Sequence, residues 1–327
     1  MNIGVGVISP AAPWILPPAY VEQLRRAFPQ HTFLEAWSRE ELRRVLPQVD
    51  AAFAAYVDRD LVASLPRLRW VQAPAAGIGH LLSAELVASP IVVTSARGVR
   101  ARAIAEHVLG VTLALARQLH VAIRRQDAHV WALDEIEASG AVRTLHGRRM
   151  GIVGLGSIGT AVARVAAAFG MRVSATRKRA DQPVPDGVEE VLPPAGLPRL
   201  LAASDVVVLA AAQTPETRLL IGRDALTHVK RGALLINVGR GTLVDDEAVL
   251  EALGDGRLGG AALDVFTREP LDPASPYWDR PDVIVTPHVS GAMEDYWTPL
   301  VALFSENLRR FEAGQPLLNV VDKQAGY

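Results

Sequence analysis

The chain has 327 residues, half of them hydrophobic, which is enough to fill the cores of two domains. Its 34 Lys and Arg residues against 35 Asp and Glu leave a net charge of −1, which argues against a nucleic-acid partner, and the lack of cysteine excludes disulfides and cysteine nucleophiles. Because the chain shows no signal-peptide pattern and no apolar run of the ~20 residues that a membrane span needs, we expect a soluble cytoplasmic protein without a membrane partner.

The first part of the chain alternates short β-rich runs with helical runs, which is typical of a parallel α/β sheet. Strands are predicted at residues 2–9, 31–37, 51–57, 68–74 and 91–96. Helical patterns fall between them at 18–28 and 39–46, and a long helical region covers 102–131. These residues therefore predict a first α/β domain and the start of a second one.

A second series of strands begins in the middle of the chain. It is predicted at residues 148–155, 172–176, 204–211, 232–238, 259–266 and 282–287. The last segment, 296–314, is an amphipathic helix that ends at Gly314, a residue suited to a helix C-terminus. Because this second series starts and ends inside the chain, the pattern predicts one domain inserted into another, with hinges near 94–100 and 286–292.

The sequence GIVGLGSIGTAVA at 151–163 is typical of a dinucleotide-binding turn. Gly154 permits a tight turn, Gly156 lets the backbone approach a pyrophosphate, and Gly159 lets the helix pack closely on the strand. Ser157 and Ile158 open that helix, whose N-terminus favours an anion. The motif alone also fits a plain tight turn, but the strand–turn–helix–strand context favours a cofactor site.

The residues after the next predicted strand indicate which cofactor binds. NAD-preferring sites carry an acidic residue there, which accepts hydrogen bonds from the ribose 2′-hydroxyl. Here Thr176 takes its place and is followed by Arg177, Lys178 and Arg179, which favour a 2′-phosphate. The alternative is a solvated basic turn without a ligand. We predict a preference for NADPH, with NAD also possible and with Arg177 as the main phosphate contact, supported by Lys178.

Three polar residues follow apolar strands further along the chain, namely Arg240, Glu269 and His288. Since ligands bind at the carboxyl ends of strands in such sheets, the three could converge. An arginine can bind a carboxylate through two hydrogen bonds, a histidine can transfer a proton near neutral pH, and a glutamate can orient that histidine. Taken singly, they also fit a surface charge, a solvated loop acid and a turn residue.

Nearly the whole chain resembles the D-isomer-specific 2-hydroxyacid dehydrogenase family, and in particular its NADP-preferring glyoxylate/hydroxypyruvate reductase-like branch. The resembling stretches include AAGIGHL, SARGVRARAIAEHVLG, VGLGSIGTAVA, LINVGRGTLVDDEAVLEAL, AALDVFTREPL and VIVTPHVSG. The resemblance implies that Arg240, Glu269 and His288 are the catalytic residues. It also implies a Rossmann domain at 99–287, inserted into a flavodoxin-like substrate domain formed by 1–98 and 288–327.

The same resemblance implies the remaining site residues. The backbone amides of Gly77, Ile78 and Gly79 would hold the substrate carboxylate, as expected for a glycine-rich anion-binding turn. The cofactor would further be lined by Thr214, Pro215, Val238, Gly239 and Asp264. No histidine pattern indicates a metal site. Trp14, Tyr56 and Trp297 fit either core packing or the substrate cleft, and members of the family usually form homodimers through the Rossmann domain.

Together these features predict hydride transfer between NAD(P)H and a small 2-keto acid, such as glyoxylate or hydroxypyruvate, with cleft closure that excludes water. The alternative is a cofactor-sensing, corepressor-like binding protein with little or no turnover. A second enzymatic alternative is the oxidation of an inorganic or one-carbon acid on the same fold. The sequence does not distinguish among 2-keto acids, because side-chain specificity depends on loop geometry.

Overall fold

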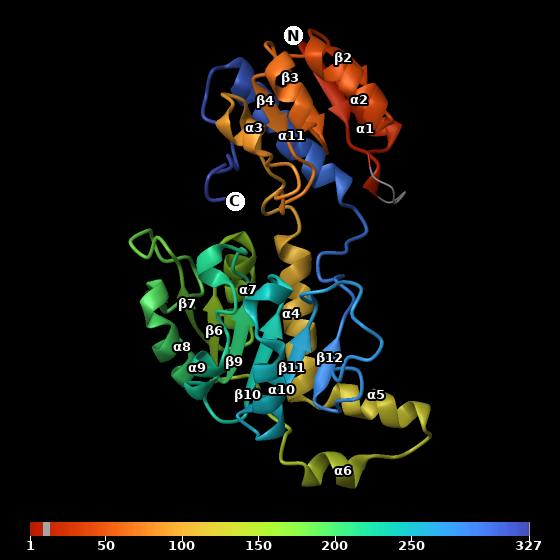
Figure 1. Cartoon of the computed structure of the whole chain (residues 1–327). Helices are drawn as coiled ribbons and strands as arrows, with labels where there is room; N and C mark the ends of the chain where they lie inside the picture. The colour runs from red at the N-terminus through yellow and green to blue at the C-terminus, as the bar shows by residue number, and fades with distance from the viewer. Residues whose placement is uncertain (9–13, 327) are drawn as a thin grey trace. The chain divides into compact units, whose positions relative to one another are not determined.

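A computed structural model describes residues 1–8 and 14–326, which form two compact units (Figure 1). Unit 1 comprises Met1–Val99 and Met293–Tyr327, and unit 2 comprises Arg100–Ala292. Unit 2 is thus inserted into the sequence of unit 1, and each unit has its own parallel sheet. The predicted fold class, two doubly wound parallel-sheet domains with one inserted into the other, is confirmed.

Unit 1 has a five-stranded sheet in the order β2-β1-β3-β4-β5, which is the flavodoxin-like order. Its strands are β1 (Asn2–Gly6), β2 (Thr32–Glu35), β3 (Ala51–Ala54), β4 (Trp70–Gln72) and β5 (Val92–Thr94). Its helices are α1 (Pro18–Ala27), α2 (Arg39–Val45), α3 (Ala84–Ala88) and α11 (Trp297–Glu312). All five strands predicted before residue 100 are present, although Ser9, the last residue predicted in the first, lies outside the described residues.

The C-terminal helix α11 belongs to the core of unit 1. The ring of Phe304 stacks on Phe53 and Trp70 at centroid distances of 4.8 and 5.3 Å. The buried Asn307 donates to Gln72 Oε1 and accepts from the Leu318 amide. These contacts explain why residues from both ends of the chain form one unit. Gly314 follows α11 with φ of +64°, as expected for a glycine that ends a helix.

Of the three aromatic residues left open by the sequence, two lie partly buried in unit 1. Trp297 packs against the core beneath α11, and Tyr56 packs against the core on the other face of the sheet. Trp14 is 42% exposed, and its ring meets the edge of Tyr296 at 5.8 Å.

Unit 2 has a seven-stranded parallel sheet in the order β12-β11-β10-β9-β6-β7-β8, the Rossmann order with one added strand. Its strands are β6 (Arg149–Val153), β7 (Arg172–Thr176), β8 (Glu190–Leu192), β9 (Val206–Leu209), β10 (Ala233–Asn237), β11 (Leu258–Leu263) and β12 (Val283–Val285). Its helices are α4 (Ala101–Ala116), α5 (Leu119–Asp127), α6 (Leu133–Ala138), α7 (Ser157–Ala168), α8 (Leu197–Ala203), α9 (Arg223–Thr227) and α10 (Asp246–Gly254).

Two elements of unit 2 differ from the sequence prediction. The edge strand β8 was not predicted, because its three residues carry no strong apolar pattern. The helical region 102–131 is not continuous: α4 ends before Arg117, and Gln118 has a φ of +57°, which starts α5 in a new direction. Helix α4 itself packs on α7 and the sheet, where Val108 and Leu115 share a core with Val162.

The boundaries of the units fall at Val99/Arg100 and at Ala292/Met293, within and at the end of the predicted hinge segments. Residues 288–292, which the sequence assigned to the C-terminal part of the substrate domain, pack with unit 2. The reason is a set of hydrogen bonds from this segment to Asp264 at the end of β11. Hinge motion about these boundaries remains a prediction.

Candidate active site

The glycine-rich turn after β6 has the geometry that a pyrophosphate-binding turn requires. Gly154 has a φ of +99°, and a Cβ on it would lie 2.6 Å from the backbone of Ala211. A Cβ on Gly159 would lie 2.3 Å from the Gly154 carbonyl oxygen, so α7 can approach β6 this closely only with glycine there. Gly156 is exposed, with no atom within 4 Å of an added Cβ. This open backbone, at the N-terminus of α7 opened by Ser157 and Ile158, fits a dinucleotide.

The basic turn after β7 begins at the buried Thr176, whose carbonyl oxygen accepts from the amides of Gly154 and Leu155 at 3.1 Å. The glycine turn and the basic turn are therefore joined directly. The Arg177 guanidinium is held within its own loop, because Nη2 donates to the carbonyl oxygen of Gln182 at 2.5 Å. The side chain of Lys178 is exposed to solvent.

The loop after β9 lies near this basic turn. Thr214 precedes the short helix Pro215–Thr217, and its amide donates to the Thr217 hydroxyl at 2.8 Å. The pKa of Glu216 is lowered, first by a hydrogen bond from Thr214 and further by the positive charge of Lys178. Residues after β7 and β9 thus lie at the same carboxyl edge of the sheet, where the sequence analysis places the adenosine end of a cofactor site.

Arg240 follows β10 through Val238 and Gly239. The side-chain amide of Asn237 bonds to the Arg240 carbonyl oxygen at 3.0 Å, while its oxygen accepts from the Gly239 amide at 3.1 Å. These bonds hold the turn, and a Cβ on Gly239 would meet Leu243 at 2.7 Å. The half-buried Arg240 donates from Nη1 to the Gly239 carbonyl oxygen at 2.6 Å. The remaining donors of the guanidinium can serve an anion.

Glu269 and His288 come together as the sequence predicted. His288 Nδ1 lies 2.7 Å from Glu269 Oε2, and the other carboxylate oxygen of Glu269 accepts from the Phe266 amide at 2.9 Å. Glu269 thereby fixes the ring of His288 and leaves Nε2 for a substrate. The His288 side chain is 52% exposed, so solvent or a small molecule can reach it. This pair can hold and deliver a proton.

Asp264 has a structural task that the sequence did not reveal. It is 1% exposed, and its Oδ1 accepts from the Thr286 hydroxyl at 2.6 Å and from the Val289 amide at 2.9 Å. Its Oδ2 accepts from the Ser290 amide at 3.0 Å, and its carbonyl oxygen accepts from the His288 amide at 2.9 Å. Asp264, predicted as a cofactor contact, therefore also holds the turn that carries His288, which has a φ of +54°. The one signal of this role in the sequence is the position of Asp264 directly after a buried strand.

We expect Asp264→Ala to lower the free energy of unfolding by roughly 3 kcal/mol, because the buried amide of Ser290, the amide of Val289 and the hydroxyl of Thr286 lose their acceptor. Urea denaturation of the two proteins measures the difference. Asp264→Asn keeps one oxygen acceptor, so its free energy of unfolding should fall less than that of Asp264→Ala. Equal stability of Asp264→Ala and the wild type would show that the carboxylate does not hold this turn.

The predicted substrate turn lies in unit 1. Ile78 is 2% exposed and anchors the turn in the core, whereas Gly79 is exposed and has no atom within 4 Å of an added Cβ.

The described residues contain no group of three or more metal-ligating side chains. Within residues 1–8 and 14–326, no helix is both long and apolar enough to cross a membrane.

Comparison with known proteins identifies the family. Residues 109–290, more than half of the chain, match the NAD binding domain of the D-isomer specific 2-hydroxyacid dehydrogenases. A glyoxylate reductase of Korarchaeum cryptofilum is 34% identical over 270 residues, which cover 82% of this chain and 80% of that protein.

Two solved structures resemble the chain over almost its full length. A D-isomer specific 2-hydroxyacid dehydrogenase from Xanthobacter autotrophicus, in complex with NADPH and MES, is 31% identical, with a TM-score of 0.83 and 99% of both chains covered. An NADPH-dependent glyoxylate/hydroxypyruvate reductase from Sinorhizobium meliloti, in complex with NADP and sulfate, is also 31% identical, with a TM-score of 0.79 and coverage of 100% and 99%. With the site geometry above, these matches show that the chain belongs to the D-isomer specific 2-hydroxyacid dehydrogenase family of NAD(P)-dependent oxidoreductases.

Proposed function

We propose that this protein reduces a small 2-keto acid, such as glyoxylate or hydroxypyruvate, to the D-2-hydroxy acid with NADPH. The observation that carries the proposal is the 2.7 Å contact of His288 with Glu269, on the same sheet edge as Arg240 and the glycine turn. Bound cofactor supplies the hydride that is added to the carbonyl carbon.

In this proposal each residue of the triad has one task. His288 donates a proton from Nε2 to the substrate oxygen, and it accepts that proton in the reverse reaction. Glu269 keeps the ring in the required tautomer and stabilises its positive charge. Arg240 binds the substrate carboxylate or carbonyl oxygen and stabilises the negative charge that develops on that oxygen.

The remaining site residues have binding tasks. Gly154, Gly156, Ser157, Ile158 and Gly159 hold the pyrophosphate, while Thr214, Pro215, Val238, Gly239 and Asp264 line the rest of the cofactor. The backbone amides of Gly77, Ile78 and Gly79 hold the substrate carboxylate, in line with the open position at Gly79. We propose that the substrate domain, predicted as residues 1–98 and 288–327, corresponds to unit 1, and that the cofactor domain, predicted as 99–287, corresponds to unit 2, which also includes residues 288–292.

A substrate panel tests the reductase against the sensor. Glyoxylate, hydroxypyruvate, pyruvate and branched 2-keto acids are each mixed with enzyme and NADPH, and the loss of absorbance of the reduced cofactor is followed. We expect turnover with at least one short 2-keto acid. If the protein binds NADPH but consumes it with none of these keto acids, the result would favour the cofactor-sensing alternative. The relatives named above are reductases and dehydrogenases, which supports the enzyme.

The preference for NADPH rests on the residues after β7. Thr176 has no charge to repel a 2′-phosphate, and Arg177 and Lys178 add two cations where an acid would select NAD. The carbonyl oxygen of Gln182 fixes the Arg177 guanidinium in place, so a phosphate contact would cost little side-chain entropy. The two solved relatives that bind NADPH or NADP support this preference.

We expect Arg177→Ala to lower the ratio of kcat/KM for NADPH over NADH by about 10- to 100-fold, the effect of a lost charge-assisted hydrogen bond. Steady-state kinetics with both cofactors measure the ratio. Arg199→Ala, on an exposed arginine paired with Glu190, serves as the control and should leave the ratio unchanged. A wild type that prefers NADH, or an unchanged ratio in Arg177→Ala, contradicts the assignment.

We propose a cytoplasmic homodimer that forms through unit 2 and has no nucleic-acid partner. Helices α5 and α6 and the segment between them expose Ile123 (60%), Trp131 (90%) and Leu133 (51%), and such apolar exposure favours burial by a second subunit. Sedimentation equilibrium measures the assembly, and a monomer at micromolar concentration contradicts it.

A further inference from the structure

A cavity of about 250 Å³ lies at the amino ends of β6, β9 and β10 in unit 2. Its lining includes Asp205, directly before β9, Gly232, directly before β10, and the segment 139–148 that leads into β6. The glycine turn and Arg240 follow the carboxyl ends of β6 and β10, and Glu269 and His288 follow those of β11 and β12 in the same sheet. The cavity therefore lies at the opposite edge of the sheet from the proposed active site. It has room for several water-sized groups of about 30 Å³ each.

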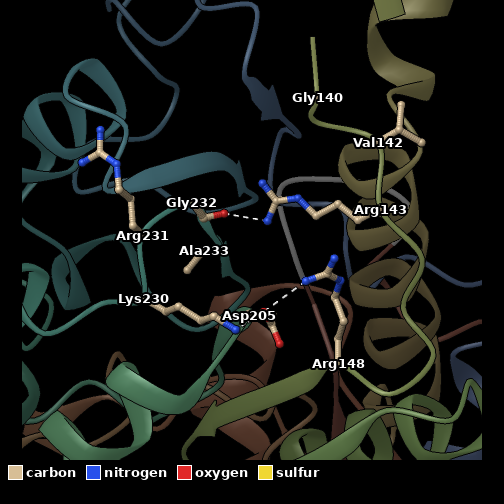
Figure 2. Close-up of a pocket in the computed structure, with 9 residues that line it drawn as sticks. All are labelled: Gly140, Val142, Arg143, Arg148, Asp205, Lys230, Arg231, Gly232 and Ala233. Carbon is tan, nitrogen blue, oxygen red and sulfur yellow. Dashed lines mark hydrogen bonds and ion pairs between the residues drawn. The ribbon is translucent and has the colours of Figure 1, made fainter. Parts of the chain in front are cut away.

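Three cationic side chains meet in this cavity. Figure 2 shows Arg143, Arg148 and Lys230 pointing toward one another around Asp205, whereas Arg231 points away. Arg231 is engaged elsewhere, because it donates to the carbonyl oxygen of Asp255 at 2.8 Å. Of the described residues that line the cavity, only Asp205 is acidic.

Asp205 balances only part of this charge. Its Oδ1 accepts from Lys230 Nζ at 2.6 Å and from Arg148 Nη1 at 3.3 Å, and its Oδ2 accepts from the Arg149 amide at 3.0 Å. Burial opposes ionisation, but the bonds from Arg149 and Lys230 outweigh it and lower the pKa of Asp205. A single ionised carboxylate thus faces three cations.

Arg143 is the cation without a carboxylate. Its Nη1 donates to the Gly232 carbonyl oxygen at 2.6 Å, and among the described residues it forms no ion pair. Burial, and then the positive charge of Arg148, lower the pKa of Arg143. A half-buried guanidinium beside a second one is costly unless an anion joins them.

We infer that this cavity is a binding site for a phosphate group, either inorganic phosphate or a phosphate monoester. Two guanidinium groups and an ammonium suit the several oxygens and double negative charge of phosphate, since each guanidinium can donate two parallel hydrogen bonds. The ligand would connect the segment 139–148 to the start of β10, where Arg143 already reaches Gly232. Because the site lies at the far edge of the sheet, it can be filled while the cofactor is bound.

Calorimetric titration tests this site in the protein saturated with NADPH, so that the basic turn at Arg177 is already occupied. Inorganic phosphate and glycerol 3-phosphate are titrated separately at constant ionic strength, because unspecific attraction depends on salt. We expect saturable binding in the wild type that is weakened about tenfold or more in Arg143→Gln and in Arg148→Gln. Arg172→Gln changes an exposed arginine paired with Glu189 and should bind like the wild type.

Arg143→Lys controls for a folding defect in Arg143→Gln, since it keeps the positive charge. It should bind phosphate more tightly than Arg143→Gln. Tighter binding of glycerol 3-phosphate than of phosphate would identify a monoester as the ligand, and equal or weaker binding would identify phosphate itself. The inference is overturned if the NADPH-saturated wild type takes up neither anion. It is also overturned if folded Arg143→Gln and Arg148→Gln bind as tightly as Arg172→Gln.

Discussion

Replacing His288 by alanine should reduce kcat about 10²- to 10⁴-fold, which is the usual contribution of a general acid–base group. The reason is that His288, held by Glu269 at 2.7 Å, is the proton donor in the proposed reaction. The dissociation constant of NADPH should stay close to that of the wild type, because His288 belongs to neither the glycine turn nor the basic turn. Steady-state kinetics and a fluorescence titration of NADPH measure the two quantities.

The control for this variant is His228→Ala, which removes an exposed histidine at the end of α9. Its kcat should equal that of the wild type. Near-normal turnover of His288→Ala would contradict the assignment of the proton donor. A loss of NADPH binding in parallel with kcat would instead indicate that the substitution disturbs the turn held by Asp264.

Arg240→Ala should lower kcat roughly 10²- to 10³-fold, the cost of removing a donor to a developing oxyanion. It should also raise KM for the keto acid, because the guanidinium binds the substrate in the ground state as well. Arg240→Lys keeps the charge without the two parallel donors and should recover only part of the activity. Initial rates over a range of keto-acid concentrations, at saturating NADPH, separate the two effects.

Two results would oppose the role of Arg240. A change in KM alone would restrict this residue to substrate binding, since kcat would then be independent of it. A similar loss in Arg199→Ala, whose exposed side chain pairs with Glu190, would point to a general effect of lost charge on the unit. Because Asn237 holds the Arg240 turn through backbone atoms, the fold of the turn should survive both Arg240 substitutions.

Local sequence patterns determined much of this protein. Strands are recognisable where apolar runs are fully buried, as in 206–209 and 233–237, and the glycine turn is recognisable because Gly154 and Gly159 occupy positions where a side chain would clash. The order of the polar residues after successive strands predicted that Arg240, Glu269 and His288 would converge. Of the three, Glu269 and His288 lie in contact, because parallel strands place their carboxyl ends at one edge of the sheet.

Other features required the tertiary structure. The edge strand β8 is held by pairing with β7 more than by its own composition, and the break at Gln118 follows a backbone conformation that no residue in the region announces. The boundary at Ala292/Met293 depends on hydrogen bonds between Asp264 and residues 25 and 26 positions later. Such long-range bonds leave no spacing pattern in the sequence.

The basic cavity is the clearest case of this kind. Arg143, Arg148, Asp205 and Lys230 come from three separate segments of the chain, and each alone resembles an ordinary surface charge. Their charges interact only because the sheet brings the starts of β6, β9 and β10 to one edge. Coulomb interactions depend on distance in space and on burial, and both are decided by the folded structure alone.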